Sequence, residues 1–510
     1  MKVTLIRPPV YSVGLMGPQL VPVLGIAYIA AAIREAGHEV DIVDMCGEAI
    51  DRSEMVNGKY VQYGMTPATL KTRIQFADAI GFACMFSQDW PFHRGLIQYV
   101  RELFPEAVLF AGGEHITALP EFCLEDCPSL DLCVLGEGDG AIVDLIHMLD
   151  KEGSLSEAPS LVYRDKNGGY ARTKRAERIG NIDALSWPAW DLIPMENYLS
   201  RGLTYHLKRG RTIPMLATRG CPYHCSFCSN ENMWGRRWLP RDPKSVVDEM
   251  EHYIKIYKAE NFVFSDLTAV ISRESIVSLC QEILRRKLRI TWQLPTLRTE
   301  SLDAEVLRVM YAAGCRELDF ALESGSTDVL KSVDKRNDPK KICSLIKDGL
   351  KLGMNLSTNI VIGLPQERFR DFLKTYGLMM KLAVAGLQEL NVFPFVPYPG
   401  SRLFKEFLEQ KKIKLGDEYF MKLFGYADLS KAVSWSAHFG PRTLSGMRFG
   451  LLSSFYSLML ISHPLRMLQL FINPARGRVN TKLEGVLQRV FRNIQITFRK
   501  SSRIKLHQDI

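Results

Sequence analysis

The sequence lacks the features that mark secreted and membrane-spanning proteins. Its most apolar stretch, residues 450–462, is about 13 residues long and is stopped by Pro464, whereas a helix needs about 20 apolar residues to cross a bilayer. No basic, apolar, small-residue series opens the chain, because MKVTLIRPPV reads as a strand that runs into a proline turn. We therefore expect a protein of the cytoplasm.

A disulfide framework is also missing, because the 11 cysteines are an odd number scattered through a long chain. Eight of them lie mostly in apolar or helical runs, where a free cysteine behaves as a small hydrophobe. These eight are Cys46, Cys84, Cys123, Cys127, Cys133, Cys280, Cys315 and Cys343. No second pair of soft ligands lies near Cys123 and Cys127 to complete a zinc site. The three remaining cysteines need another explanation.

The composition is that of a folded, water-soluble protein, with 46% hydrophobic and 24% charged residues. A chain of 510 residues should divide into at least three domains. The net charge of +9 is uneven, because residues 474–510 hold nine Lys or Arg against Glu484 and Asp509. No paired-carboxylate or nucleophilic-serine motif stands out.

Residues 1–150 alternate short apolar runs with helical segments, which predicts a doubly wound parallel sheet of the Rossmann type. Ligands bind such a sheet at the carboxyl ends of its strands. The unusual residues gather there, in Arg7-Pro8-Pro9, Phe86-Ser87-Gln88, Gly112-Gly113-Glu114-His115 and Gly136-Glu137-Gly138. Glycine lets a bulky ligand approach the backbone, although these glycines could simply make tight turns.

A second strand and helix series follows an ordered linker at residues 151–205. Six apolar strand segments, each followed by a helical segment, lie in residues 206–405 and predict a partial (β/α)6 barrel with its chemistry at the strand ends. Residues 406–510 turn helical. In the tail, apolar residues between 483 and 498 recur at helical spacing with arginines between them. Such a helix can lie in a membrane surface or pack on the body with solvated arginines.

Three cysteines within eight residues, Cys221, Cys225 and Cys228, follow the first predicted barrel strand in the segment TRGCPYHCSFCSN. Iron-sulfur clusters take cysteine thiolates, and three ligands on one cubane leave an iron open to another ligand. Zinc would require a fourth protein ligand, which His224 or His206 could supply.

This C-x3-C-x2-C motif, with Phe227 before the third cysteine, resembles the signature of the radical S-adenosylmethionine (SAM) enzymes. The resemblance implies a 4Fe-4S cluster on the three cysteines, whose open iron chelates SAM, and an external electron donor that reduces the cluster. It also places SAM-binding residues at later strand ends. These are Phe227, Ser265, Asp266, Glu323, Ser324, Gly325 and Ile362.

The segments GGEHITALPE, VLGEGDG and PAWDLIP resemble the cobalamin-dependent branch of that family, over roughly residues 1–405. The resemblance implies that cobalamin contacts Pro9, Phe86, Ser87, Gln88, Gly112, Gly113, His115, Gly136, Glu137 and Gly138. No histidine stands in the D-x-H-x-x-G motif that ligates cobalt in other B12 domains. We therefore expect cobalamin without a histidine axial ligand, with residues 86–88 facing the lower side of the corrin.

The resemblance implies methylation of an unactivated carbon. The opening residues MKVTLIRPPVYSVGLMG through REAGHEVDIVDM are similar to hopanoid C-3 methylases, and the apolar 450–462 stretch, the FPFVPYPG segment and the basic tail fit a polycyclic lipid met at the inner face of a membrane. Two alternatives remain. One is a cyclase of the anaerobic magnesium-protoporphyrin ester type, and the other is a non-catalytic cobalamin or iron-sulfur sensor. A nucleic-acid partner is not expected, because the aromatic residues of the tail lie on an apolar helix face.

Overall fold

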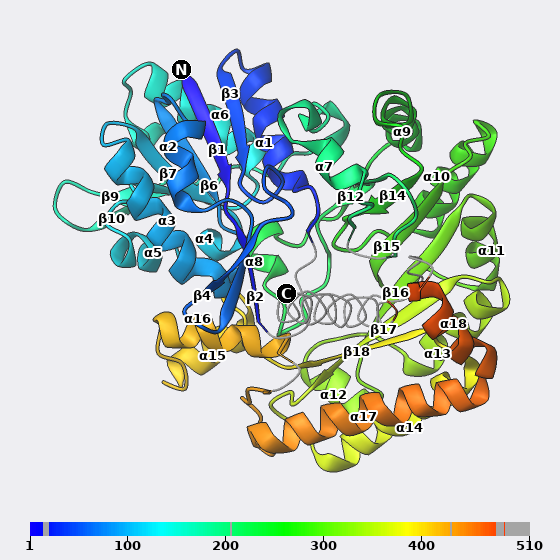
Figure 1. Cartoon of the computed structure of the whole chain (residues 1–510). Helices are drawn as coiled ribbons and strands as arrows, with labels where there is room; N and C mark the ends of the chain where they lie inside the picture. The colour runs from blue at the N-terminus through cyan, green and yellow to red at the C-terminus, as the bar shows by residue number, and fades with distance from the viewer. Residues whose placement is uncertain (14–19, 205–206, 429–430, 476–483, 485–510) are drawn as a thin grey trace, which may run out of the picture.

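The fold is taken from a computed structural model, which describes residues 1–13, 20–204, 207–428, 431–475 and 484. Two parallel sheets, each covered by helices, form the two halves of the molecule, and a helical region lies along one side of both (Figure 1). The α/β class, the doubly wound sheet, the six-stranded barrel and the helical C-terminal region are as predicted. The predicted amphipathic tail helix lies almost entirely outside the described residues.

The N-terminal sheet has seven strands in the order β10-β9-β8-β7-β6-β1-β3. Five are parallel: β1 (Lys2–Arg7), β3 (Glu39–Asp44), β6 (Ala79–Ala83), β7 (Val108–Gly112) and β8 (Leu132–Val134). The chain leaves β1 in one direction through β3 and in the other through β6, so the strand order reverses beside β1. Open sheets bind ligands at such a reversal, beyond the carboxyl ends of the strands.

Two parts of this half are not evident from the sequence. Strands β9 (Leu161–Arg164) and β10 (Tyr170–Arg172), from the segment expected to be a linker, extend the sheet in antiparallel fashion. Strands β2 (Val10–Val13), β4 (Ser53–Val56) and β5 (Tyr60–Tyr63) form a separate antiparallel sheet. These strands are only three or four residues long, too short for a clear hydrophobic alternation.

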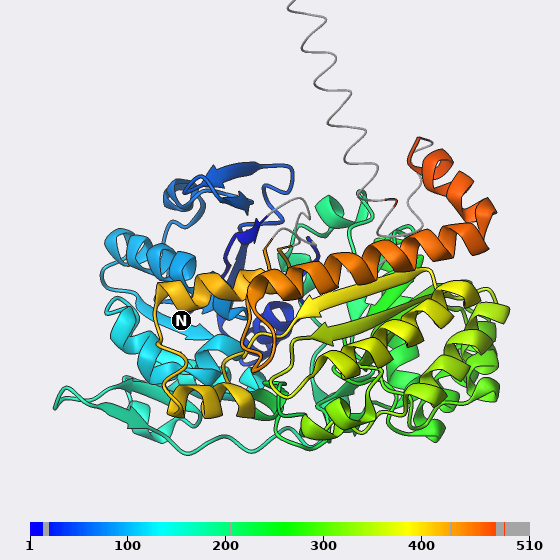
Figure 2. The ribbon, with the colours of Figure 1, turned by 90° about the horizontal axis from the view of Figure 1, so that it is seen from below.

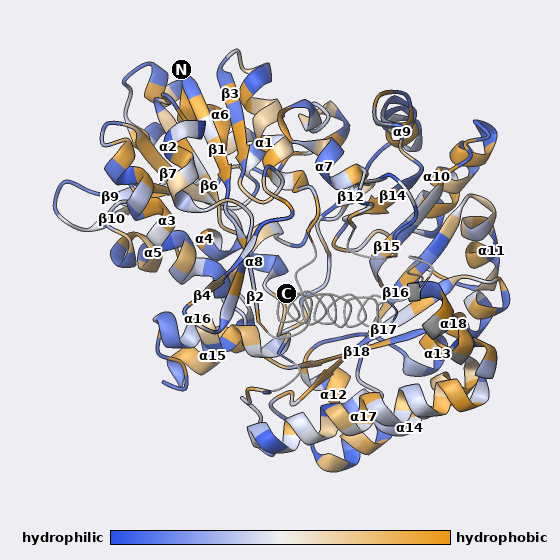
Figure 3. Cartoon of the chain, in the orientation of Figure 1, coloured by the Kyte–Doolittle hydropathy of each residue, from blue (hydrophilic) through white to orange (hydrophobic). Residues whose placement is uncertain are grey.

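The second half is a curved sheet of six parallel strands that follow one another in sequence order. They are β11 (Thr212–Met215), β14 (Asn261–Phe264), β15 (Thr291–Leu297), β16 (Cys315–Glu323), β17 (Asn355–Ile362) and β18 (Glu389–Pro394). Helices α9 (Pro243–Tyr257), α10 (Arg273–Arg285), α11 (Ala304–Ala312), α13 (Pro339–Lys351) and α14 (Phe369–Ala385) cover its outside (Figure 1). Figure 3 shows apolar residues on both the strands and the helices that cover them.

The barrel helices begin where the sequence supplies side-chain caps. Asp242, Ser272, Asp303 and Asp338 each accept a hydrogen bond from a backbone N–H in the first turn of α9, α10, α11 and α13. Such caps satisfy amide groups that have no partner within the helix. They fix the points at which each strand-end loop becomes a helix, and therefore the lengths of the loops that carry candidate site residues.

The C-terminal region consists of α15 (Arg402–Glu409), α16 (Asp417–Leu423), α17 (Pro441–Ser462) and α18 (Pro464–Ala475). Helix α17 is 22 residues long, so the apolar stretch at 450–462 belongs to a longer element than the sequence suggested. It starts early because Pro441 occupies the first helical position, where the missing N–H costs nothing. Among the described helices, α17 alone is long and apolar enough to cross a membrane. A single helix of this kind is weak evidence for a membrane span.

Helix α17 packs against α14 and β18, and its buried residues include Leu444, Leu451 and Phe455. Figure 2 shows it crossing one side of the molecule, with α18 turning away at its end. His463 at the turn contacts the Val384 carbonyl oxygen, with 3.0 Å between Nε2 and O. Because one face is packed on the barrel, α17 is part of the folded body.

Candidate cofactor sites at the facing strand ends

The three motif cysteines lie between β12 (Thr218–Arg219) and α8 (Asn230–Trp234), at the carboxyl end of the first barrel strand. Cys221 and Cys225 are partly exposed and Cys228 is exposed, whereas seven of the other eight cysteines are buried. All eleven are free thiols. The seven buried cysteines serve as small apolar side chains in the core. The three thiols of the loop are accessible and can therefore act as ligands.

An arginine from a different strand end contacts this loop. The Arg298 guanidinium lies 3.4 Å from the centre of the Tyr223 ring, and its Nη1 donates to Cys225 Sγ at 3.7 Å. Glu300 accepts from Arg298 Nε at 3.0 Å and from Nη2 at 2.5 Å. Arg298 therefore links the end of β15 directly to the cysteine loop. The sequence analysis missed Arg298, whose only signal is its position just after β15.

The donor set fits a cluster better than a single metal ion. Among the described residues, no three His, Cys, Asp or Glu side chains are grouped closely enough to hold one ion. A cubane accepts thiolates that are spread over its corners, whereas a structural zinc ion needs four ligands at tetrahedral positions. His224 contacts Arg236, with 2.9 Å between Nδ1 and Nη2, and His206 lies outside the described residues. The described residues therefore do not support the zinc alternative.

Two carboxylates of the N-terminal half hold the strand that leads into the cysteine loop. Arg219 donates from Nη1 and Nη2 to the two carboxylate oxygens of Asp139 at 2.8 and 3.1 Å, and from Nη1 to Glu137 at 2.8 Å. All three side chains are at most 6% exposed. The Glu137 carboxylate, expected to contact cobalamin, is thus occupied by protein partners. Asp139 and Arg219 were not singled out by the sequence.

Asp266, expected to contact SAM, supports the same segment. It accepts from Thr218 Oγ1 at 2.5 Å and from the Ala217 N–H at 3.2 Å, and it is 5% exposed. Burial raises the pKa of Asp266 to about 6, while the hydrogen bonds from Thr218 and Ala217 act in the opposite direction. Its neighbour Ser265 is half-buried. Asp266 therefore positions the residues that precede Cys221.

The end of β16 has an unusual backbone. Glu323 has a φ of 65°, which is rare for a residue other than glycine, and it accepts from Lys335 Nζ at 3.0 Å. Such strain persists where the surroundings over-determine it, as they do at ligand sites. The Lys335 ammonium also lies 5.9 Å from the Phe227 ring centre, so this buried ion pair lies next to the cysteine loop.

The neighbouring predicted residues are tied to the fold. The Gly325 N–H donates to Thr375 Oγ1 at 2.9 Å, and a Cβ at Gly325 would approach the Thr375 Cα to 2.7 Å. Ser324 Oγ lies 3.3 Å from the same hydroxyl oxygen. Ile362 is fully buried in the main core. These three residues shape the strand ends through α14 and β17.

The loop after β6 presents an apolar surface. Phe86 is 51% exposed, whereas Ser87 and Gln88 are buried. Tyr398 accepts from the Ser87 N–H at 2.8 Å and donates to Gln88 Oε1 at 3.1 Å. Tyr398 comes from the FPFVPYPG segment, which the sequence analysis associated with an apolar substrate. Only Phe86 of the three predicted residues has a side chain open to a ligand.

His115 is fully buried, and its ring contacts protein groups on both sides. Its Nδ1 lies 2.9 Å from Ser87 Oγ and its Nε2 lies 3.4 Å from Cys123 Sγ. Burial lowers the pKa of His115 to about 3, so the ring is neutral. It supports the 86–88 loop from behind. His115 itself therefore has no ring nitrogen open to a ligand at this edge of the sheet.

Glycines at the ends of β7 and β8 let the backbone pass close to other groups. Gly113 has a φ of 115°, and a Cβ there would lie 2.6 Å from the Cys84 carbonyl oxygen. Gly136 has a φ of 71°. Gly112 and Gly138 flank these turns, and Pro9 is buried beyond β1. At Gly113 and Gly136 the positive φ accounts for glycine by a tight turn.

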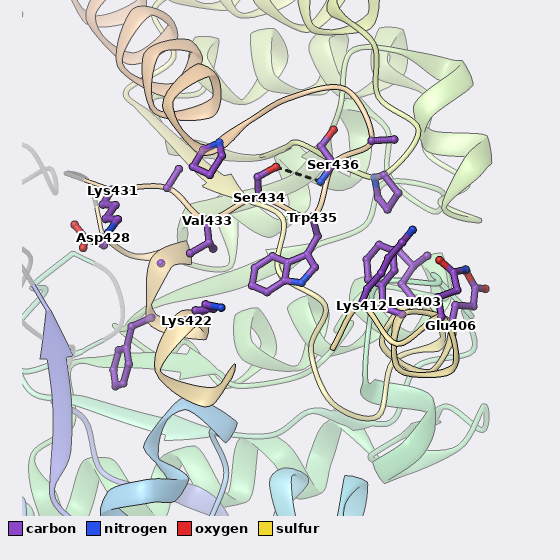
Figure 4. Close-up of a pocket in the computed structure, with 18 of the residues that line it drawn as sticks. Leu403, Glu406, Lys412, Lys422, Asp428, Lys431, Val433, Ser434, Trp435 and Ser436 are labelled. Atoms are coloured by element: carbon purple, nitrogen blue, oxygen red, sulfur yellow. Dashed lines mark hydrogen bonds between the residues drawn. The ribbon is translucent and has the colours of Figure 1, made fainter. Parts of the chain in front are cut away.

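A large pocket of about 1090 Å³ lies outside this arrangement. It is formed by α15, α16 and the segment that leads to α17, and Trp435 projects into it (Figure 4). Ser226 of the cysteine loop lines its inner end, but no predicted cofactor residue does. The pocket therefore reaches the loop from a different side than the facing strand ends.

Comparisons with known proteins agree with this arrangement. Residues 215–379 match the model of the radical SAM superfamily, and residues 17–146 match that of the B12 binding domain. A solved structure of the radical SAM methyltransferase TsrM from Kitasatospora setae, with cobalamin and a [4Fe-4S] cluster bound, covers 90% of this chain and 88% of its own at a TM-score of 0.64 and 16% identity.

Curated relatives are similar over most of their length. The chain is 26% identical to the uncharacterized methyltransferase PH0819 of Pyrococcus horikoshii, over 79% of this chain and 83% of that protein. It is 27% identical to the anaerobic magnesium-protoporphyrin IX monomethyl ester cyclase of Rubrivivax gelatinosus, over 80% and 70%. The hopanoid C-3 methylase of Methylococcus capsulatus is 22% identical, over 74% and 67%.

A B12-binding sheet joined to a barrel with three accessible cysteines at its first strand end defines a radical SAM enzyme with a second, corrinoid cofactor. The chain belongs to the cobalamin-dependent radical SAM family, and its cofactors are a 4Fe-4S cluster, SAM and cobalamin. It is therefore an enzyme and not the non-catalytic sensor considered above.

Proposed function

We propose that this enzyme transfers a methyl group from SAM, by way of cobalamin, to an unactivated carbon of a largely apolar substrate, a hopanoid-like polycyclic lipid. The observation that carries this proposal is the contact between the two cofactor regions. Arg219 leads into the cysteine loop, and its guanidinium ends on Glu137 and Asp139 at the carboxyl end of β8. The end of β8 and the residues that lead into the cysteine loop are therefore in direct contact.

In this proposal Cys221, Cys225 and Cys228 would hold the cluster, and the exposed Phe86 would be the side chain that contacts cobalamin. Cluster-bound SAM supplies hydrogen abstraction and cobalamin carries the methyl group. The protein's own residues orient these groups. Arg298 holds Cys225, Asp266 holds the approach to Cys221, and the Glu323 and Lys335 pair fixes the end of β16 next to Phe227.

A membrane surface is the second part of the proposal, because a polycyclic lipid is met there. Helices α17 and α18 expose large apolar side chains: Phe449 75%, Ile461 77%, Leu465 74%, Leu468 59% and Ile472 41%. From residue 429 to residue 483 the sequence has no Asp or Glu, but it has Lys or Arg at 431, 442, 448, 466, 476, 478 and 482. Of these, Lys431 and Arg442 are exposed, whereas Arg448 is buried and donates to the Asp428 carbonyl oxygen. Exposed apolar groups with cations beside them fit the inner, anionic face of a membrane.

A second candidate function is the cyclase reaction, which the 27% identity to the magnesium-protoporphyrin ester cyclase favours. The two functions differ in product mass. Lipid and pigment profiles of cells with and without the protein should show a new species one methylene heavier than its precursor. A new species that has lost hydrogen and gained oxygen, with no added methylene, would instead establish the cyclase reaction.

A further inference from the structure

The barrel strands alternate between a face that packs on the helices and a face that points into the barrel. Successive residues of a strand point to opposite sides of the sheet. The helix-facing residues Trp292, Leu294, Leu318, Phe320, Leu356 and Ile360 belong to one apolar core with the helices. The residues between them therefore face the inside of the barrel.

The amino-terminal part of this inner face is polar across four neighbouring strands, whereas Val361 on β17 and Phe393 on β18, nearer the carboxyl ends, lie on the same face and are apolar. The polar part contains Gln293 on β15, Glu317 and Asp319 on β16, Ser357 and Asn359 on β17, and Glu389 and Asn391 on β18. Their strand pairing places Gln293 beside Glu317, Asp319 beside Ser357, and Ser357 beside Glu389. An apolar substrate alone would gain nothing from such a surface, because burying polar groups without partners is costly.

Part of this polar face is satisfied within the protein. Asn391 Nδ2 donates to Asn359 Oδ1 at 3.0 Å, and Asn359 Nδ2 donates to Asp319 Oδ1 at 3.0 Å. Both asparagines are half-buried, so the chain of amides borders accessible space. On the β15 side of the polar face, Glu317 accepts a hydrogen bond from the Leu207 N–H at 3.4 Å.

Two side chains of the face have no hydrogen-bond partner among the residues that the structure describes. Gln293 is fully buried, and neither its Oε1 nor its Nε2 has a hydrogen-bond partner. Ser357 is 4% exposed and its Oγ is also without a partner. A buried polar group without a hydrogen-bond partner lowers the free energy of unfolding. Gln293 and Ser357 are therefore candidates for hydrogen bonds to a bound ligand.

We propose that Gln293 and Ser357 receive a neutral hydrogen-bonding group of the substrate, a hydroxyl or an amide, that enters the barrel. Both side chains can donate and accept, which matches a group that does the same. An anionic group is disfavoured, because carboxylates at Glu317, Asp319 and Glu389 lie beside them. This inference rests on the proposed function and narrows its substrate class from an apolar lipid to an amphiphile with one neutral polar end.

The test uses the full-length enzyme loaded with all three cofactors. The variants are Gln293→Met, which keeps the shape and removes the hydrogen bonds, and Ser357→Ala. The matched control is Thr358→Val on the opposite face of β17, since Thr358 Oγ1 already donates to the Phe320 carbonyl oxygen at 2.9 Å. Two quantities are measured: the unfolding midpoint without substrate, and methyl transfer from labelled SAM into an extract of host-cell lipids.

We expect Gln293→Met and Ser357→Ala to unfold no lower than the wild type and to lose about fivefold to tenfold in methyl transfer at limiting extract, the effect of one hydrogen bond. The Thr358→Val control should unfold lower and keep its methyl transfer per folded molecule. Accurate mass of the labelled product should reveal a hydroxyl or amide group.

Other outcomes overturn the inference. A lower midpoint for both test variants with unchanged transfer would mean that Gln293 and Ser357 bind only structural water. A labelled product that is a pure hydrocarbon would also exclude it. If the wild type labels nothing, the methyl-transfer proposal fails, and the unfolding midpoints still decide whether the two side chains are structural.

Discussion

Asp139 and Arg219 form a bidentate ion pair that joins the two halves of the enzyme. Arg219 Nη1 and Nη2 lie 2.8 and 3.1 Å from the two carboxylate oxygens of Asp139, and the side chains are only 5% and 6% exposed. Asp139 lies in the first turn of α6 (Gly138–Asp150), in the half that matches the B12 binding domain. Arg219 is two residues before Cys221. The pair therefore fixes the cysteine loop relative to the N-terminal sheet.

Replacing Asp139 with Asn should destabilise the protein strongly, because it leaves a buried guanidinium short of one partner. Losing one member of a buried pair costs about 3 to 5 kcal/mol, and the midpoint of thermal unfolding measures the loss. The matched control is Asp51→Asn, whose partner is Arg201 and whose side chain is 75% exposed. Because that pair is exposed to solvent, its loss should leave the unfolding midpoint nearly unchanged. Equal effects of the two substitutions would show that the buried pair has no special role.

Replacing Cys221, Cys225 or Cys228 with Ala should remove the visible absorbance and the bound iron of the cluster, since each thiolate is an iron ligand. The Cys343→Ala variant is the control, because Cys343 is also partly exposed but lies on α13, away from the loop. It should keep a full iron content. A complete complement of iron in any of the three loop variants would contradict the assignment of ligands.

Glu367 should make the stability depend on pH. It is fully buried, the Gly363 N–H donates to it at 2.5 Å, and burial raises its pKa from 4.5 to about 7. The folded state then holds the proton more tightly than the unfolded state does. Stability should therefore fall by on the order of 2 to 3 kcal/mol as the pH rises from 4.5 to 7. Chemical unfolding of Glu367→Gln should lack this part of the slope, and parallel profiles would refute the shift.

The exposed apolar residues of α17 and α18 should bind anionic vesicles. Burying one leucine or isoleucine side chain contributes about 1.5 to 3 kcal/mol, so Ile461→Glu or Leu465→Glu should lower vesicle binding about tenfold or more. Flotation with vesicles of phosphatidylglycerol and phosphatidylcholine measures this. Met55→Glu is the control, because Met55 is 64% exposed on β4 in the other half. Undiminished binding of the Ile461 and Leu465 variants would exclude this surface.

The contribution of the C-terminal segment is separable from that of the helices. A chain lacking residues 474–510 should float less well with anionic vesicles, since it loses nine Lys or Arg and two acidic residues. It should still cleave SAM, because none of the candidate cofactor residues lies in that range. Vesicle binding equal to that of the full chain would mean that α17 and α18 are sufficient.

The sequence predicts the six barrel strands well, because each carries apolar residues in a short run or in alternation and a helical segment follows it. It also predicts the cysteine loop, since three ligands fall within one continuous segment. The strands β2, β4 and β5 were not predicted, because four residues are too few to show a clear period. Pairing between distant segments, such as Arg298 with Cys225 or Tyr398 with Ser87, has no local signal at all.

Contacts between distant segments also decide what each predicted site residue does. A strand-end position indicates that a residue is near the site, but not whether its side chain faces a ligand or the protein. His115 and Asp266 lie at the predicted edge, and their hydrogen bonds are spent on Ser87 and Thr218. Phe86 lies at the same edge and remains half exposed. Only packing against other elements decides between these roles.

The central claim is methyl transfer from SAM to a substrate carbon, and the fate of a labelled methyl group tests it most directly. Reduced enzyme loaded with cluster and cobalamin is incubated with SAM carrying a trideuterated methyl group and with host-cell lipid extract. We expect a new product that contains all three deuterium atoms, formed together with 5′-deoxyadenosine and dependent on added cobalamin. A new product that forms with 5′-deoxyadenosine but contains no deuterium would contradict the account.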